Sequence, residues 1–152
     1  MQGIAEQFGR GGVLHQMPRV HDPHGVGDAG HNAQFGVEDE SNVVFTSNAT
    51  HGLNIAIHTL VQPGSRVVIS GYEHNAVTRP LHAIPNVEIA VADGPLFHPE
   101  AVTEAFEALV HPGVDAVICT HVSNVFGCVQ PVEEMAALCV EAGVPFLLDA
   151  SQ

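Results

Sequence analysis

The sequence predicts an α/β domain in which a mainly parallel sheet carries helices on both faces. From residue 42 onward, short apolar runs rich in Val and Ile alternate with segments of helical periodicity. Most of these runs are continuously apolar, which is typical of strands that are covered on both faces. The links between strands and helices are short, as in consecutive βαβ units. In such sheets ligands bind at the carboxyl ends of the strands, so we expect the functional residues at that edge.

Five apolar runs are the predicted strands, and helical periods separate them. The strands are expected at residues 43–46, 66–70, 87–91, 116–120 and 145–149. The clearest helical faces are centred on the apolar residues Ile57, Phe106 and Met135. A weaker helix is predicted over about residues 75–83, although it contains a proline. Pro99 suits a first helical turn and Gly143 a helix end, so both support these boundaries.

The N-terminal part of the chain has a different composition. Residues 9–36 are rich in Gly and His and show neither a helical nor an alternating apolar period. We therefore predict that residues 1–41 are a loop-like segment and that residues 42–152 form the α/β domain. The 152 residues, of which 45% are hydrophobic, are enough for one domain with a buried core.

Charge and cysteine content exclude several classes of function. The formal net charge of −13 argues against nucleic acid and against an anionic membrane surface as partners. No apolar run reaches the length of a membrane-spanning helix. Three cysteines without a CxxC pair do not suggest a disulfide framework, so a reducing cytoplasm is the expected location. All 4 basic residues are arginines, and this excludes chemistry that needs a lysine of this chain.

Four features follow predicted strands, and each has a simple structural interpretation beside a functional one. Residues 47–52 lead into a helix, whose N-terminus is either merely capped or an anion site. His74 and Asn124 are either structural residues of their turns or ligand contacts. Asp149 closes an apolar strand and either caps the next helix or pairs with a cationic ligand group. An anion cradle, an imidazole, an amide and a carboxylate on one edge match what pyridoxal phosphate (PLP) requires.

Several ordered motifs resemble a known family. Residues 42–152 are similar to the class V aminotransferases among the fold-type I PLP enzymes, and specifically to the cysteine desulfurase and selenocysteine lyase branch. The matching stretches are VFTSNAT (44–50), EHNAV (73–77), RPL (79–81), HVSNVFG (121–127) and LDASQ (148–152). The resemblance implies the partial PLP-binding large domain of a transferase or lyase that acts on cysteine or selenocysteine and forms a homodimer.

The same resemblance implies roles for individual residues. Ala49 and Thr50 would hold the cofactor phosphate, and His74 would stack on the pyridine ring and assist proton transfer. Asn124 would lie beside the phenolic oxygen of the cofactor and the substrate carboxylate.

The last motif supplies two further cofactor contacts. Asp149 would pair with the pyridinium nitrogen, and Gln152 would donate a hydrogen bond to the phenolic oxygen. In the family the lysine that binds PLP follows a Ser-x-His motif further downstream, beyond Gln152. We therefore expect an incomplete chain that has no independent catalysis, although the family converts cysteine to alanine and transfers the sulfur to an enzyme cysteine.

The cysteines and histidines leave alternatives open. Cys119 and Cys139 are expected in the core, and Cys128, the only cysteine placed to be an edge thiol, is also expected to pack. One alternative function is a catalytically inactive remnant that binds PLP weakly or acts as an interaction protein. Another is a metal-binding module, because the chain has 11 histidines and residues 21, 24 and 31 are among them.

Overall fold

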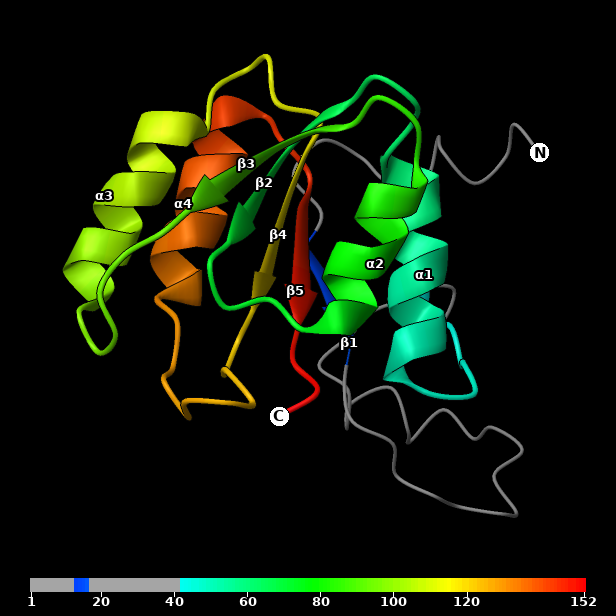
Figure 1. Ribbon diagram of the computed structural model, residues 1–152, viewed down its shortest axis with the longest axis horizontal. Helices are drawn as coiled ribbons and strands as arrows, with labels where there is room; N and C mark the ends of the chain where they lie inside the picture. Colours follow the sequence, from blue (N-terminus) through cyan, green and yellow to red (C-terminus); the bar gives the residue numbers. More distant parts are fainter. Residues whose placement is uncertain (1–12, 17–41) are drawn as a thin grey trace.

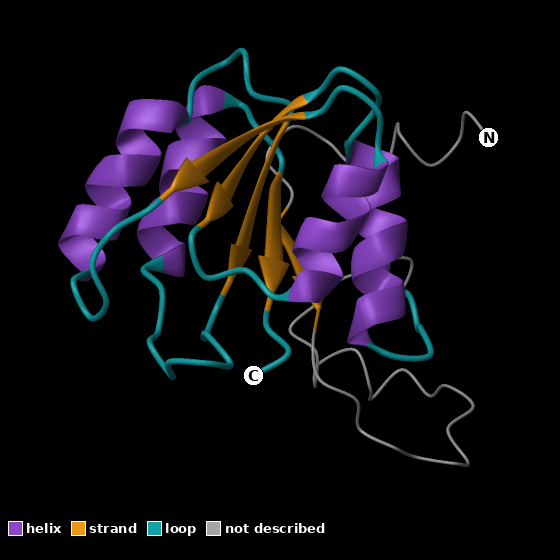
Figure 2. Cartoon of the chain, in the orientation of Figure 1, coloured by secondary structure: helices purple, strands orange, loops and turns teal. Residues whose placement is uncertain are grey.

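A five-stranded parallel sheet lies between two pairs of helices (Figures 1 and 2). The computed structural model describes residues 13–16 and 42–152. In chain order the elements are β1 (Val13–Gln16), α1 (Ala49–Leu60), β2 (Arg66–Ser70), α2 (Asn75–Ala83), β3 (Glu88–Ala92), α3 (Pro99–Leu109), β4 (Ala116–Thr120), α4 (Val132–Ala142) and β5 (Phe146–Asp149). The predicted fold class is therefore confirmed, with strands and helices alternating along the chain.

The strand order β1-β5-β4-β2-β3 places β4 in the middle of the sheet, between β5 and β2. All pairs are parallel, with Val67 opposite Ala116 and Thr120 opposite Asp149. Because the strands are parallel and nearly in register, their carboxyl ends meet at one edge. The ends of β2, β4 and β5 are neighbours there, and this is the edge at which a ligand is expected.

Each face of the sheet is covered by one pair of helices (Figure 1). On one face, Ile57 of α1 and Leu81 of α2 join a core with Ile118 of the central strand β4. On the other face, Phe106 of α3 and Met135 of α4 pack with the strand residues that alternate with the first set. The continuously apolar strands are explained by this arrangement, because successive side chains enter opposite cores.

Local sequence signals account for the helix boundaries. Asn48 is the N-cap of α1, and its side-chain oxygen accepts the backbone N–H of His51 at 2.8 Å. Pro99 begins α3, where its missing N–H costs no helical hydrogen bond. Gly143 ends α4 at φ 68°, a left-handed conformation that glycine adopts without a steric penalty. The predicted helix over residues 75–83 coincides with α2 despite Pro80.

Two predictions about the first part of the chain were wrong. Residues 43–46 do not form a strand, and Val44 and Phe45 are 76% and 85% exposed. The sheet is instead completed by Val13–Gln16, which pairs with β5 inside the segment predicted as loop. Residues with high β-propensity form a strand only where a neighbouring strand completes their hydrogen bonds. Residues 43–46 lead into α1 instead of pairing in the sheet. The other residues of the predicted loop-like segment, with its clustered histidines, lie outside the described residues.

The helices in the described part of the chain run from 9 to 12 residues. Within residues 13–16 and 42–152, none is long and apolar enough to cross a membrane.

Candidate functional site

Every site residue predicted from the sequence lies at the carboxyl edge of the sheet. This edge also carries the first turns of the helices that follow the strands, as the course of the ribbon shows (Figure 1). The residues are Ala49, Thr50, His74, Asn124, Asp149 and Gln152. They come from separate segments, so the parallel topology brings together residues that are up to about 100 positions apart.

The N-terminus of α1 presents free backbone donors. The cap residue Asn48 accepts the N–H of His51 through its side chain and that of Gly52, at 3.1 Å, through its carbonyl. The N–H groups of Ala49 and Thr50 have no partner among the described residues. The first turn of α1 contains no acidic residue that would repel an anion. This helix end is therefore chemically suited to a phosphate group.

His74 is the N-cap of α2, and this role determines its tautomer. Its Nδ1 accepts the backbone N–H of Ala76 at 3.1 Å. An Nδ1 that accepts a hydrogen bond carries no proton, so the proton of the neutral ring is on Nε2. The residue is exposed, and its ring is therefore available to a ligand as a flat surface with one N–H donor.

Asp149 ends β5 and is 5% exposed. Its Oδ1 accepts the backbone N–H of Ser151 at 3.2 Å and also the Ser151 hydroxyl. Its backbone carbonyl accepts the N–H of His121 at 2.8 Å, which joins the end of β5 to the segment after β4. The structure gives Asp149 no ion pair with any described residue. A buried carboxylate without a cation suits a ligand that carries a positive charge.

Asn124 and Gln152 are exposed at the same edge. Asn124 lies in a tight loop between β4 and α4, in which Gly127 at φ 68° donates its N–H to the carbonyl of Ser123 at 2.8 Å. Gln152 follows the Asp149–Ser151 turn. Both side chains can thus approach a ligand that rests on the edge, and the structure leaves their roles as predictions.

One functional candidate was missed when roles were assigned from the sequence, namely Glu73. Its Oε1 accepts the N–H of Thr120 at 2.8 Å and the hydroxyl of Ser70, so the side chain connects the ends of β2 and β4. Its Oε2 is buried and has no partner in the described part of the chain. Burial raises the pKa of Glu73 to about 7, and the nearby charge of Asp149 adds to this effect. An acid near the end of an apolar strand, the signal that identified Asp149, was present at Glu73 as well, three residues after β2.

The cysteines are part of the core, as predicted. All three are free and buried, and Cys128 is 3% exposed. Burial raises the pKa of the Cys139 thiol to about 12 and that of the Cys119 thiol well above its usual value. A thiol that stays protonated is a poor nucleophile. These two cysteines therefore serve packing, and no group of His, Cys, Asp and Glu within the described residues could hold a metal ion.

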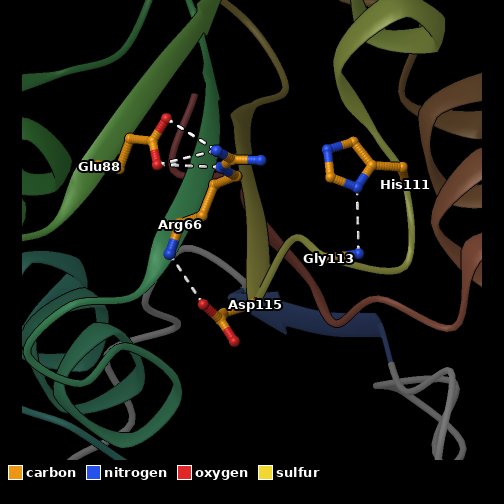
Figure 3. A network of polar contacts seen from close by, with 5 residues as sticks. All are labelled: Arg66, Glu88, His111, Gly113 and Asp115. Carbon is orange, nitrogen blue, oxygen red and sulfur yellow. Dashed lines mark hydrogen bonds and ion pairs between the residues drawn. The ribbon is translucent and has the colours of Figure 1, made fainter.

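The opposite edge of the sheet also carries charges, but they are paired and open to solvent (Figure 3). The guanidinium of Arg66 binds the carboxylate of Glu88 at 3.0 Å. The backbone N–H of Arg66 is accepted by Asp115 at 2.8 Å. Nearby, the Nδ1 of His111 accepts the N–H of Gly113 at 3.1 Å. Each of these groups has a partner within the chain and gives no reason to expect a ligand.

Comparisons with known proteins identify the family and the fold of the chain. The profile of the family described as aminotransferase class-V matches residues 31–152. A probable cysteine desulfurase of Mycolicibacterium paratuberculosis is 30% identical over 132 residues, which covers 79% of this chain. The apo structure of a cysteine desulfurase from Thermococcus onnurineus NA1 matches 80% of this chain with a TM-score of 0.65 and 23% identity. A variant of C-DES with glycine covalently linked to its PLP cofactor matches 80% of it with a TM-score of 0.67 and 21% identity.

The chain spans only a minor part of these proteins. It covers 18% of the length of the Mycolicibacterium relative. It covers 31% of the Thermococcus chain and 34% of the C-DES chain. The structural matches are below 25% in identity, so they establish the fold, whereas the family profile covers most of the sequence.

Proposed function

Because the chain belongs to the class V aminotransferase family, we propose that its carboxyl edge binds PLP and forms part of a cysteine desulfurase-like enzyme. One observation carries this proposal. A free helix N-terminus, an imidazole with a defined tautomer and a buried carboxylate without a cation lie at one edge of a single sheet. A ligand with an anionic phosphate, a flat ring and a protonated ring nitrogen is complementary to that combination.

The residues present fit such a cofactor. The free N–H groups of Ala49 and Thr50 would hold its phosphate, since no acid lies in that helical turn. His74 would lie against the ring and offer its Nε2 proton to an oxygen of the cofactor or substrate. Asp149 would bind the protonated ring nitrogen, which would provide the cation missing beside it.

The remaining predicted residues would act on the substrate side. When bound, PLP supplies a ring that withdraws electrons from the α-carbon of an amino acid. Asn124 would orient the substrate carboxylate, and Gln152 would donate a hydrogen bond to the phenolic oxygen. The names of the matched relatives, which are cysteine desulfurases, support cysteine as the substrate. We propose, from the family resemblance, that the complete enzyme converts cysteine to alanine and transfers the sulfur to an enzyme cysteine. The three cysteines of this chain are buried, so we do not assign that transfer to them.

For this polypeptide taken alone, one observation favours a narrower function. A covalent bond between a side-chain amine and the cofactor aldehyde would need a lysine, and the sequence contains no lysine. We therefore propose that the 152-residue chain binds PLP noncovalently and is inactive by itself.

The test is a titration of the purified chain with PLP, followed by the absorbance of the cofactor. We expect saturable binding with the band of the free aldehyde, and treatment with borohydride should attach no cofactor to a side chain. An Asp149→Asn variant should bind more weakly. Absence of saturable binding would contradict the proposal, as would a cofactor-linked peptide from the interior of the chain.

The homodimer and the cytoplasmic location implied by the family belong to the same proposal. Val125, Phe126 and Val129 of the loop between β4 and α4 are 74%, 51% and 63% exposed. We expect a second copy to cover this apolar surface, because apolar surface gathered on one loop is typical of an interface. Sedimentation of the chain and of a Val125→Asp variant tests this, and equal monomeric masses for both would contradict it. The free cysteines accord with a reducing compartment such as the cytoplasm.

A further inference from the structure

Glu73 connects two strands at the centre of the candidate site. It lies three residues after the end of β2, next to His74, and its Oε1 accepts the N–H of Thr120, the last residue of β4, at 2.8 Å. The hydroxyl of Ser70 at the end of β2 is a second partner of the same oxygen. The residue as a whole is partly exposed, but its second oxygen, Oε2, is buried and unpartnered among the described residues.

This carboxyl lies beside a second buried carboxyl. Thr120, to which Glu73 binds, is the register partner of Asp149 on the adjacent strand β5. The titratable group whose charge raises the pKa of Glu73 is Asp149 from β5, and the charge of Glu73 in turn raises the pKa of the Cys119 thiol on β4. Of the arginines in the described residues, Arg66 begins β2 at the opposite edge and Arg79 is exposed on α2. Neither acid forms an ion pair with these arginines or with His74 and His121 of the same edge.

Two buried carboxyls without a cation repel each other when both are charged, so one of them keeps its proton to a higher pH than an ordinary carboxyl does. Each carboxyl accepts two donors at one oxygen: Ser151 donates twice to Oδ1 of Asp149, and Thr120 and Ser70 donate to Oε1 of Glu73. The two acids differ at the second oxygen, because within the described residues Oε2 of Glu73 is buried without a partner and Oδ2 of Asp149 is not, so burial disfavours the charged form of Glu73. The proton therefore belongs on Glu73, and the burial that raises its pKa acts in the same direction.

We propose that Glu73 is a positioning residue: as a neutral acid it ties β2 to β4, holds the turn that presents His74, and leaves Asp149 as the single buried negative charge of the edge. The benefit of that charge for a protonated ring nitrogen rests on the proposed function. The protonation of Glu73 is a property of the chain itself and can be measured without any cofactor.

The first experiment is a ¹³C NMR titration of the side-chain carboxyl carbons of the chain without PLP, from about pH 4 to 9. We expect one glutamate signal with a midpoint near 7, because burial raises the pKa of Glu73. This signal should be missing from Glu73→Gln and retained in Glu107→Gln, a control that removes an exposed carboxylate of α3. If all glutamate carboxyls of the folded chain titrate near the ordinary pKa of 4.5, the proposal is overturned.

A second variant tests the coupling to Asp149 and does not depend on the folding of Glu73→Gln. In Asp149→Asn the charge that opposes ionisation of Glu73 is gone, so the midpoint of the Glu73 signal should move to lower pH. An unchanged midpoint would contradict a shared charge at this edge.

PLP binding then separates positioning from simple structural support. Glu73→Gln, which keeps the shape of the neutral acid, should bind PLP within about 3-fold of the original chain, whereas Glu73→Ala should bind about 10-fold more weakly because it leaves the N–H of Thr120 without its partner. Equal binding by both variants would overturn the positioning role. If no form of the chain binds PLP, the proposed function fails, while the NMR midpoint still decides the protonation of Glu73.

Discussion

The charged side chains at the two ends of the parallel strands differ in their exposure and in their ion pairing. At the amino edge, Arg66 and Glu88 form an ion pair whose side chains are 43% and 63% exposed. Asp115, at the same edge, accepts the backbone N–H of Arg66. At the carboxyl edge, Glu73 and Asp149 are buried carboxyls without an ion pair to any described residue.

The difference separates charges that serve the fold from charges that suit a ligand. An exposed ion pair contributes little to stability, and solvent can replace either partner. A buried acid without a cation costs free energy, and a folded chain retains it only if another benefit offsets the cost. This contrast supports the proposal that the ligand site lies at the carboxyl edge.

The largest expected effect is on the pH dependence of stability, through Glu73. Its pKa is raised from an ordinary value of 4.5 to about 7 in the folded chain. Between these values the folded state binds more protons than the unfolded state, so the free energy of unfolding falls as the pH rises and levels off above about 7. The total loss is roughly 3 kcal/mol, at about 1.4 kcal/mol for each pH unit.

Urea denaturation at a series of pH values measures this loss. Glu73→Gln has no such proton, so its stability relative to the original chain should increase as the pH rises through the same window. The amino-edge variant Glu88→Gln is the control and should lack this increase, because Glu88 is exposed. Parallel pH profiles for Glu73→Gln and the original chain would contradict the prediction.

The second effect is on cofactor binding, through Asp149. Removing the charge while keeping the shape in Asp149→Asn should weaken PLP binding by about 2 kcal/mol, or roughly 30-fold, because a buried charge loses its partner. The free energy of unfolding should not fall, because the amide oxygen still accepts the hydrogen bonds of Ser151. Absorbance titrations with PLP test the first statement and urea denaturation the second. If Asp149→Asn unfolded more easily and bound PLP normally, the charge at the carboxyl edge would serve the fold and not a ligand, which would contradict the prediction.

A smaller effect is expected from Asp115 at the amino edge. Asp115→Ala removes the acceptor of the Arg66 N–H and should lower the free energy of unfolding by about 1 kcal/mol. PLP binding should stay unchanged, since Asp115 precedes β4 at the end remote from the site. Urea denaturation and the same PLP titration are sufficient to check this. Weakened PLP binding would show that the edges are not independent.

The smallest effect belongs to the exposed ion pair. Arg66→Met should cost less than about 1 kcal/mol, and the cost should shrink in high salt because the pair is screened. Thermal denaturation at low and high ionic strength measures it. If Arg66→Met lowered the free energy of unfolding by as much as the loss predicted for Glu73, at any salt concentration, the distinction between the two edges would be contradicted.

Much of the fold could be predicted because it rests on local signals. The strands at residues 66–70 and 116–120 and the helix at 75–83 have the predicted bounds, since continuous apolar runs and helical periods are properties of neighbouring residues. The N-cap at Asn48 and the left-handed Gly143 are likewise short-range features. The parallel topology then placed the predicted site residues at one edge.

The sequence by itself determined which residue types follow the strands, and it thereby identified Asp149 and His74 as candidates. Only the tertiary structure decided that Val13–Gln16, rather than residues 43–46, completes the sheet, because a strand exists only beside a neighbour that satisfies its backbone. It also decided the state of Glu73, whose burial depends on the ends of β2, β4 and β5 meeting in space. Charge and hydrogen-bonding state depend on three-dimensional surroundings, and residues 47 positions apart in the chain create those surroundings here.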